Sequence, residues 1–152
     1  MIVMAEADTT QYRQQLTVRP WILAGVRRIV GAYVRRWGFD PLVDDAVYCV
    51  QELLTNVVKH TESPNCLLVL QRCPSGIRVV VSDTSARLPV RREPDWGAES
   101  GRGLTYVENL ADDWGAAPNE TGGKDVWFEM RSDEDSAEKL AADRTVEHLL
   151  SR

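Results

Sequence analysis

The sequence has few of the residues that mark metal sites, disulfide frameworks or membrane spans. Its 152 residues include three cysteines, Cys49, Cys66 and Cys73, with neither a CxxC pair nor the Cys/His spacing of a metal site. No apolar run approaches the roughly 20 residues that a membrane-spanning helix needs. The first ten residues lack the basic and apolar segments of a signal peptide. These absences predict a cytoplasmic protein without a membrane partner, in which Cys49 and Cys66 are buried thiols.

Two signatures of nucleotide binding are also missing. The chain has no GxxxxGK[ST] segment, which excludes a P-loop, and no strand–GxGxxG–helix unit, which argues against a dinucleotide-binding domain. A count of 18 basic against 23 acidic residues gives a net charge of −5, so a nucleic-acid-binding surface is not favoured. A hydrophobic content of 43% suits one soluble globular domain.

Hydrophobic periodicity divides the chain into short strands and amphipathic helices. We expect helices at 20–37 and 40–61, a third helix opening at Gly101, and strands at 12–18, 66–71, 77–83, 114–117 and 125–130. The strands cluster into hairpins, which predicts an α+β fold, a two-layer sandwich with helices on one face of a mixed, mostly antiparallel sheet. The domain should span 12–131, between a flexible N-terminal tail at 1–11 and an acidic C-terminal tail or helix at 132–152.

The helix at 20–37 should bury one stripe and expose a basic side. Pro20 suits its first turn, and Gly38 is a favourable stop. The expected buried stripe comprises Ile22, Val26, Ile29, Val30, Tyr33 and Trp37. The polar side carries Arg27, Arg28, Arg35 and Arg36. Two interpretations fit this side, a solvated basic face or a docking surface for an acidic partner protein.

The stretch 47–60 lacks glycine and proline and fits one continuous helix. Its apolar stripe consists of Val47, Val50, Leu54 and Val57. The opposite face groups Glu52, Asn56, Lys59 and His60. Taken alone, this polar face is equally consistent with simple exposure to solvent. Farther on, Gly101-Arg102-Gly103 opens a helix and can approach a phosphate through backbone amides; the alternative is a simple loop-to-helix turn.

The order of these motifs resembles the Bergerat-fold ATP-binding superfamily of gyrase, heat-shock chaperones, sensor histidine kinases and mismatch-repair ATPases. Over roughly 12–131 the chain looks most like the small anti-sigma-factor serine/threonine kinases, whose fold is a histidine-kinase-like ATPase domain. Residues 52–60 match the N box, and Asp83 stands where the adenine box begins. Gly101-Arg102-Gly103-Leu104 matches the second glycine box, and 122–126 lies at the last one.

The resemblance implies a site for ATP and Mg²⁺. Asn56 would give an amide oxygen to Mg²⁺, which takes few protein ligands and keeps several waters. Glu52 would be the general base toward a serine hydroxyl, or else a residue that holds the metal's waters. Asp83 would accept a hydrogen bond from the adenine amino group.

The phosphates would meet glycines and positive charge. Gly101 and Gly103 would give backbone amides access to them, and Lys59, His60 or Arg102 would add positive charge. His60 is equally consistent with a helix-end cation that faces the helix dipole.

Two boxes depart from the family pattern. The adenine box is normally Asp-x-Gly-x-Gly, whereas this chain has Asp83-Thr84-Ser85-Ala86-Arg87. Ser85 and Arg87 carry Cβ atoms where the backbone would approach the base, so Arg87 either stacks on or pairs with the nucleotide or narrows its pocket. In the last box Lys124 replaces a hydroxyl residue.

The resemblance predicts an ATP-binding regulatory protein that phosphorylates a serine of an anti-anti-sigma (STAS-type) partner and sequesters a sigma factor. It also suggests a homodimer. A second hypothesis is a non-catalytic protein-binding module of the same fold with a degraded adenine site. A third is the detached ATPase domain of a histidine kinase, against which we count the lack of a dimerisation and phospho-acceptor helix pair before residue 12.

Overall fold

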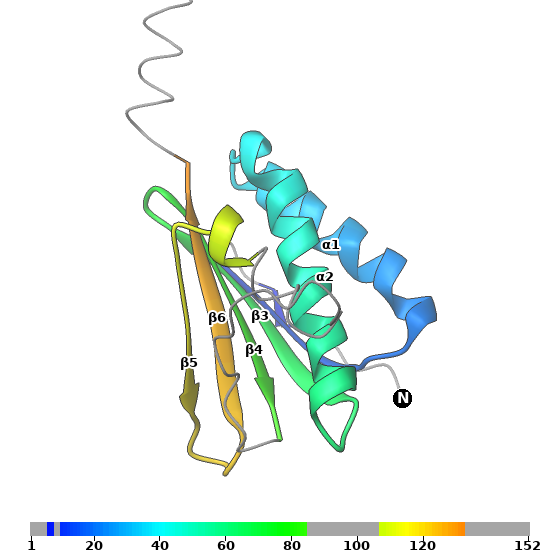
Figure 1. Ribbon diagram of the computed structural model, residues 1–152. Coiled ribbons are helices and arrows are strands. Elements are labelled where there is room, and N and C mark those ends of the chain that lie inside the picture. Colours follow the sequence, from blue (N-terminus) through cyan, green and yellow to red (C-terminus); the bar gives the residue numbers. More distant parts are fainter. Residues whose placement is uncertain (1–5, 8–9, 85–106, 133–152) are drawn as a thin grey trace, which may run out of the picture.

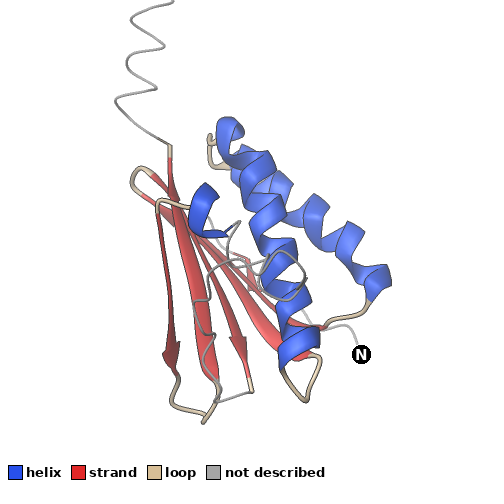
Figure 2. Cartoon of the chain, in the orientation of Figure 1, coloured by secondary structure: helices blue, strands red, loops and turns tan. Residues whose placement is uncertain are grey.

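Helices lie across one face of an antiparallel sheet (Figures 1 and 2). The computed structural model describes residues 6–7, 10–84 and 107–132. In chain order the elements are β1 (Glu6–Ala7), β2 (Gln11–Thr17), η1 (Pro20–Ile22), α1 (Leu23–Arg36), η2 (Asp40–Leu42), α2 (Val43–His60), β3 (Asn65–Cys73), β4 (Gly76–Asp83), β5 (Asp113–Pro118) and β6 (Lys124–Arg131). Residues 107–110 are also helical. This two-layer arrangement confirms the predicted α+β fold class.

The sheet runs in the order β1-β2-β3-β4-β6-β5, and each described pair of neighbours is antiparallel. Consecutive strands pair directly except that β6 lies between β4 and β5. The β4–β6 register sets Ile77 opposite Met130 at one end and Asp83 opposite Lys124 at the other. The last residue of β4 therefore lies beside the first residue of β6.

Alternate residues of the two central strands face the helices. The buried positions are Ile77, Val79, Val81, Val126, Phe128 and Met130. The residues between them, such as Arg78 and Trp127, are only partly buried. Removing these apolar side chains from water is the main force that holds the two layers together. This period of two is the pattern expected of a strand with one face buried, and it confirms the strands predicted at 77–83 and 125–130.

Helix α1 buries a stripe that includes Val34, which was not expected there, and leaves out Ile29. Val26, Val30 and Val34 are buried, and Gly38 ends the helical segment with φ +89°, a conformation open to glycine. The prediction that Ile29 belongs to the buried stripe is wrong, because its side chain is 39% exposed. Ile29 is one position before Val30 and so lies roughly 100° round the helix from it.

Three residues of the predicted N-terminal tail, Glu6, Ala7 and Gln11, belong to the sheet. Glu6 and Ala7 form β1 and pair with Arg13 and Tyr12 of β2. Gln11 is the first residue of β2 and pairs with Gln71 of β3. The backbone groups of these three residues find partners in the sheet, whereas the sequence predicted a flexible tail at 1–11. Residues 133–152 lie outside the described residues, so the acidic tail or helix stays a prediction. Among the helices described, none combines the length and the apolar composition that a membrane span requires.

Candidate functional site

The predicted site residues that the structure describes lie on α2, at the end of β4 and at the start of β6. In Figure 1, α2 and β4 both run toward the lower end of the view. Glu52 and Asn56 belong to α2, and Asp83 is the last residue of β4. Other predicted site residues lie outside the described residues, namely Arg87, Gly101, Arg102, Gly103 and the side chain of His60.

A buried ion pair joins β4 to β6 at this end of the sheet. Nζ of Lys124 lies 3.1 Å from Oδ1 and 2.9 Å from Oδ2 of Asp83. The Lys124 side chain is 7% exposed and the Asp83 side chain 3%. Each charge is thus compensated by the other where water is largely excluded. The carboxylate that was predicted to receive adenine is bound to a lysine of the same chain.

Strand alternation brings these two charges together on the helix-covered face. Asp83 follows the buried Val81 by two positions, and Lys124 precedes the buried Val126 by two. The strands also approach closely at this point, since a Cβ added to Gly123 would lie 1.8 Å from the carbonyl oxygen of Asp83. Only glycine fits there, which explains the glycine directly before Lys124.

One side chain organises the turn that leads into β6. Oδ1 of Asn119 accepts hydrogen bonds from the backbone amides of Thr121, at 3.1 Å, and Gly123, at 2.9 Å. Gly122 has φ +85°, which favours glycine. The turn therefore fixes the start of β6 and with it the place of Lys124.

Two half-buried polar side chains project from the side of α2 that faces away from α1. The side toward α1 is marked by Gln51, whose Oε1 accepts a hydrogen bond from Nη1 of Arg27 at 2.9 Å. Glu52 and Asn56 lie roughly 100° and 140° round the helix from Gln51. Within the described ranges neither side chain has a hydrogen-bond or ion-pair partner. Both therefore keep polar atoms for a ligand. Lys59, one turn farther on, is exposed.

The buried thiols next to these carboxylates are not nucleophiles. Burial, followed by the nearby Asp45 and Glu52, raises the pKa of Cys49 to about 12. Burial and then Asp83 raise the pKa of Cys66 to about 12. Both side chains are buried, as predicted, and both stay protonated at neutral pH.

The two halves of the site suit a nucleotide unequally. On α2, the amide of Asn56 and the carboxylate of Glu52 offer oxygen atoms of the kind that serve as ligands of Mg²⁺ or bind its water molecules. On the sheet, an adenine amino group would have to compete with an ammonium for Asp83, so the role predicted for Asp83 does not fit the observed pairing. The sequence contained a sign of this ion pair. Lys124 precedes Val126 and Phe128 by two and four positions, so it lies on the same buried face of the strand, and a buried lysine needs a carboxylate partner.

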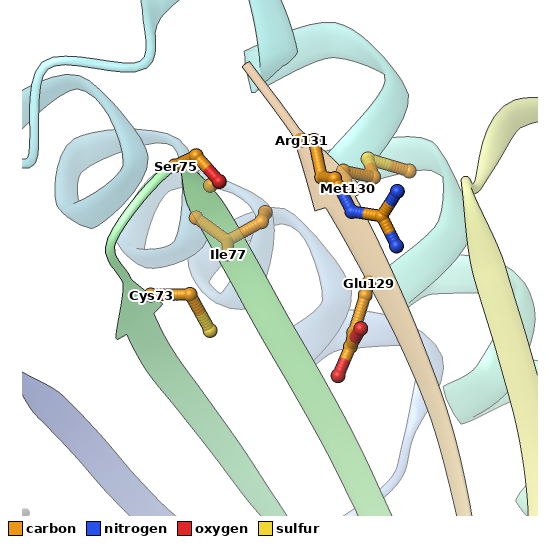
Figure 3. A pocket seen from close by; sticks show the side chains of 7 residues that line it. Cys73, Ser75, Ile77, Glu129, Met130 and Arg131 are labelled. Atoms are coloured by element: carbon orange, nitrogen blue, oxygen red, sulfur yellow. The ribbon is translucent and has the colours of Figure 1, made fainter. Parts of the chain in front are cut away.

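A separate cavity lies at the opposite end of β4 and β6 (Figure 3). It is open to solvent, has a volume of about 240 Å³ and is lined by Cys73, Ser75, Gly76, Ile77, Glu129, Met130 and Arg131. Glu129 is engaged there, because Nη1 of Arg78 lies 3.4 Å from its Oε1. None of the predicted site residues lines this cavity.

Comparison with known proteins finds one family model that matches most of the chain. A family model described as a histidine kinase-like ATPase domain matches residues 16–130, more than half of the chain. The matched range includes Glu52, Asn56, Asp83 and Lys124. No curated protein matches the sequence.

Proposed function

The chain belongs to the histidine kinase-like ATPase domain family, and we propose that it is an ATP-binding regulatory protein that acts as an anti-sigma-factor serine/threonine kinase. Its substrate would be a serine of an anti-anti-sigma (STAS-type) partner, and it would also sequester a sigma factor. The resemblance of the N box and glycine boxes to that kinase group supports this narrower assignment. A homodimer belongs to the same proposal.

The observation that carries the proposal is the pair of uncommitted polar side chains on α2. Glu52 and Asn56 are half-buried, one turn apart, and without partners among the described residues. Because both side chains are only half-buried and none of their polar atoms is bound to a described residue, those atoms are available to a ligand at this surface. Asn56 would hold Mg²⁺, which when bound neutralises phosphate charge. Glu52 would take the proton of the substrate serine or hold the metal's waters.

The exposed basic side of α1 is the proposed docking surface for an acidic region of the partner. Arg28, Arg35 and Arg36 are exposed, whereas Arg27 is partly committed to α2 through its hydrogen bond to a glutamine. Trp21, in η1 just before the start of α1, is 78% exposed and offers a large apolar contact at the opposite end of the helix from Arg35 and Arg36. Tryptophan and arginine are both enriched among the residues that dominate protein interfaces.

The buried Asp83–Lys124 pair favours a second candidate function, a non-catalytic protein-binding module of the same fold. Because the ion pair occupies Asp83, adenine loses the contact that the family resemblance predicted. The module would then act through the arginine-rich side of α1 alone. The two candidates differ in whether the chain binds ATP and passes its terminal phosphate to a protein.

Calorimetric titration with ATP, with and without Mg²⁺, tests the proposal. We expect Mg²⁺-dependent binding that Asn56→Ala abolishes while the fold is retained. Gln51→Ala is the matched control, because it removes an amide from the same helix on the side toward α1, and it should bind ATP as the parent does. Absence of binding at millimolar ATP would favour the non-catalytic module.

Phosphotransfer is measured next, with labelled ATP and a serine-bearing STAS-type protein. We expect Glu52→Ala to bind ATP and to lose phosphotransfer, since a general base contributes to the reaction rather than to binding. Full turnover by Glu52→Ala would show that Glu52 is not the base.

A further inference from the structure

Lys124 is the ion-pair partner of Asp83 and also has donor capacity that a bound ligand could use. Asp83 and Lys124 are the charged side chains that are buried in the described part of the chain. An ammonium carries three donor hydrogens. Lys124 donates a hydrogen bond to Oδ1 of Asp83 and forms an ion pair with its Oδ2, and no other described residue engages the ammonium. Lys124 can therefore donate to a ligand while it remains bound to Asp83.

A carboxylate alone distinguishes two kinds of purine by charge and hydrogen bonding. A 6-amino purine presents a donor to it, whereas a 6-oxo purine presents an oxygen that the negative charge repels. Sites that depend on one such hydrogen bond reject the analogue that lacks it by large factors. With its charge compensated by Lys124 at 2.9 Å, Asp83 no longer exerts this repulsion fully.

Lys124 also supplies what either base requires. Its remaining N–H can donate to the ring nitrogen N1 of a 6-amino purine or to the oxygen of a 6-oxo purine. The Lys124 backbone is fixed by pairing with β4 and by the turn at 119–123, and its ammonium is held by Asp83, so the same donor serves both cases.

We infer that Lys124 sets the nucleobase selectivity of the site: by holding Asp83 it removes the preference for a 6-amino purine, so that 6-amino and 6-oxo purine nucleotides bind equally well. The inference rests on the proposed function, since it requires that a nucleoside triphosphate binds between α2 and the β4–β6 pair.

Calorimetric titration of the whole protein with ATP and with inosine triphosphate, both with Mg²⁺, tests the inference directly. The two ligands share the triphosphate and ribose and differ at position 6 and the adjoining N1, whereas guanosine triphosphate would add a second amino group. We expect dissociation constants within about threefold of each other, because neither base meets a bare carboxylate. Binding of ATP that is tighter by about tenfold or more would overturn the selectivity inference and leave the proposed function standing. Binding of neither ligand would overturn both.

The variant Lys124→Thr tests the cause. It restores the hydroxyl of the family pattern and releases Asp83, so we expect a preference for ATP over inosine triphosphate of about tenfold or more. Arg72→Thr is the matched control, because it removes one exposed positive charge from β3 of the same sheet, and it should keep the parent ratio. A folded Lys124→Thr protein with the parent ratio would overturn the inference. Circular dichroism establishes folding, and the parent titration decides the question if the variant unfolds.

Discussion

Replacing Lys124 by methionine should destabilise the fold far more than replacing an exposed lysine would. The change keeps the length of the side chain and removes the ammonium that lies 2.9 Å and 3.1 Å from the two oxygens of Asp83. The Asp83 side chain is 3% exposed, so its charge would be left buried without this partner. Breaking a buried pair in this way costs about 3–5 kcal/mol. We expect Lys124→Met to lower the free energy of unfolding by that amount, measured by urea denaturation at neutral pH.

A second ion pair across the same two strands provides the control. Arg78 and Glu129 are opposite one another in the β4–β6 register, with 3.4 Å between Nη1 and Oε1, but their side chains are 38% and 30% exposed. Arg78→Met should cost less, up to about 1 kcal/mol for the ion pair and about 1 kcal/mol for the contact of its guanidinium with Trp127, 4.8 Å from the ring centroid.

The double variant Asp83→Val/Lys124→Met separates the charge from the packing. It removes both charges at once, so most of the stability lost in Lys124→Met should return. A Lys124→Met loss no larger than that of Arg78→Met would refute the argument that burial makes the Asp83–Lys124 pair energetically important.

Two further predictions concern close packing and burial. Gly76→Ala would place a Cβ 1.9 Å from the carbonyl oxygen of Met130, so it should lower the free energy of unfolding by about 1–3 kcal/mol. Gly25→Ala in α1, where an added Cβ would meet nothing within 4 Å, should raise the free energy of unfolding by about 0.5–1 kcal/mol. Equal effects of the two variants in urea denaturation would contradict this prediction. Burial and then Asp83 raise the pKa of Cys66 to about 12 from an ordinary 9.0, so the unfolded chain loses this proton at a lower pH than the folded protein does. The free energy of unfolding should therefore fall by roughly 1 kcal/mol per pH unit as pH rises from 9 toward 12. Cys66→Ala should lose less stability over that range, and an equal loss would show that Cys66 is not the cause.

The sequence predicted the elements well where a periodic pattern is decided locally. The alternation of Val126, Phe128 and Met130 identified the buried face of β6, and Gly38 identified the end of the first helical segment. The prediction for Ile29 failed because apolar residues at near-helical spacing can extend beyond the surface of the helix that is buried. Only the packing of the helix in the folded protein shows where that buried surface ends. Helical spacing alone does not supply that boundary.

The Asp83–Lys124 pair could be predicted only in part. The alternating pattern places Lys124 inward, and this requires a carboxylate partner. The partner, Asp83, is 41 positions away in the sequence. It lies next to Lys124 because β6 pairs with β4 on one side and with β5 on the other. That register is set by tertiary packing of the whole sheet, so local pattern could not identify Asp83.

The position of Lys124 also bears on where affinity for a nucleotide would come from. A buried carboxylate needs a partner both with and without a ligand, and Lys124 supplies it from within the chain. A neutral base amino group that displaced the ammonium would exchange a charge-assisted contact for a weaker one, so the base half of the site contributes little net free energy. Tight binding would then depend on the phosphates, the metal ion and the polar atoms of Glu52 and Asn56. We therefore expect removal of Mg²⁺, or of the terminal phosphate, to weaken binding more than exchange of the base does. Calorimetric titrations with ADP and with ATP lacking Mg²⁺ compare these contributions, and a larger effect of base exchange would refute the argument.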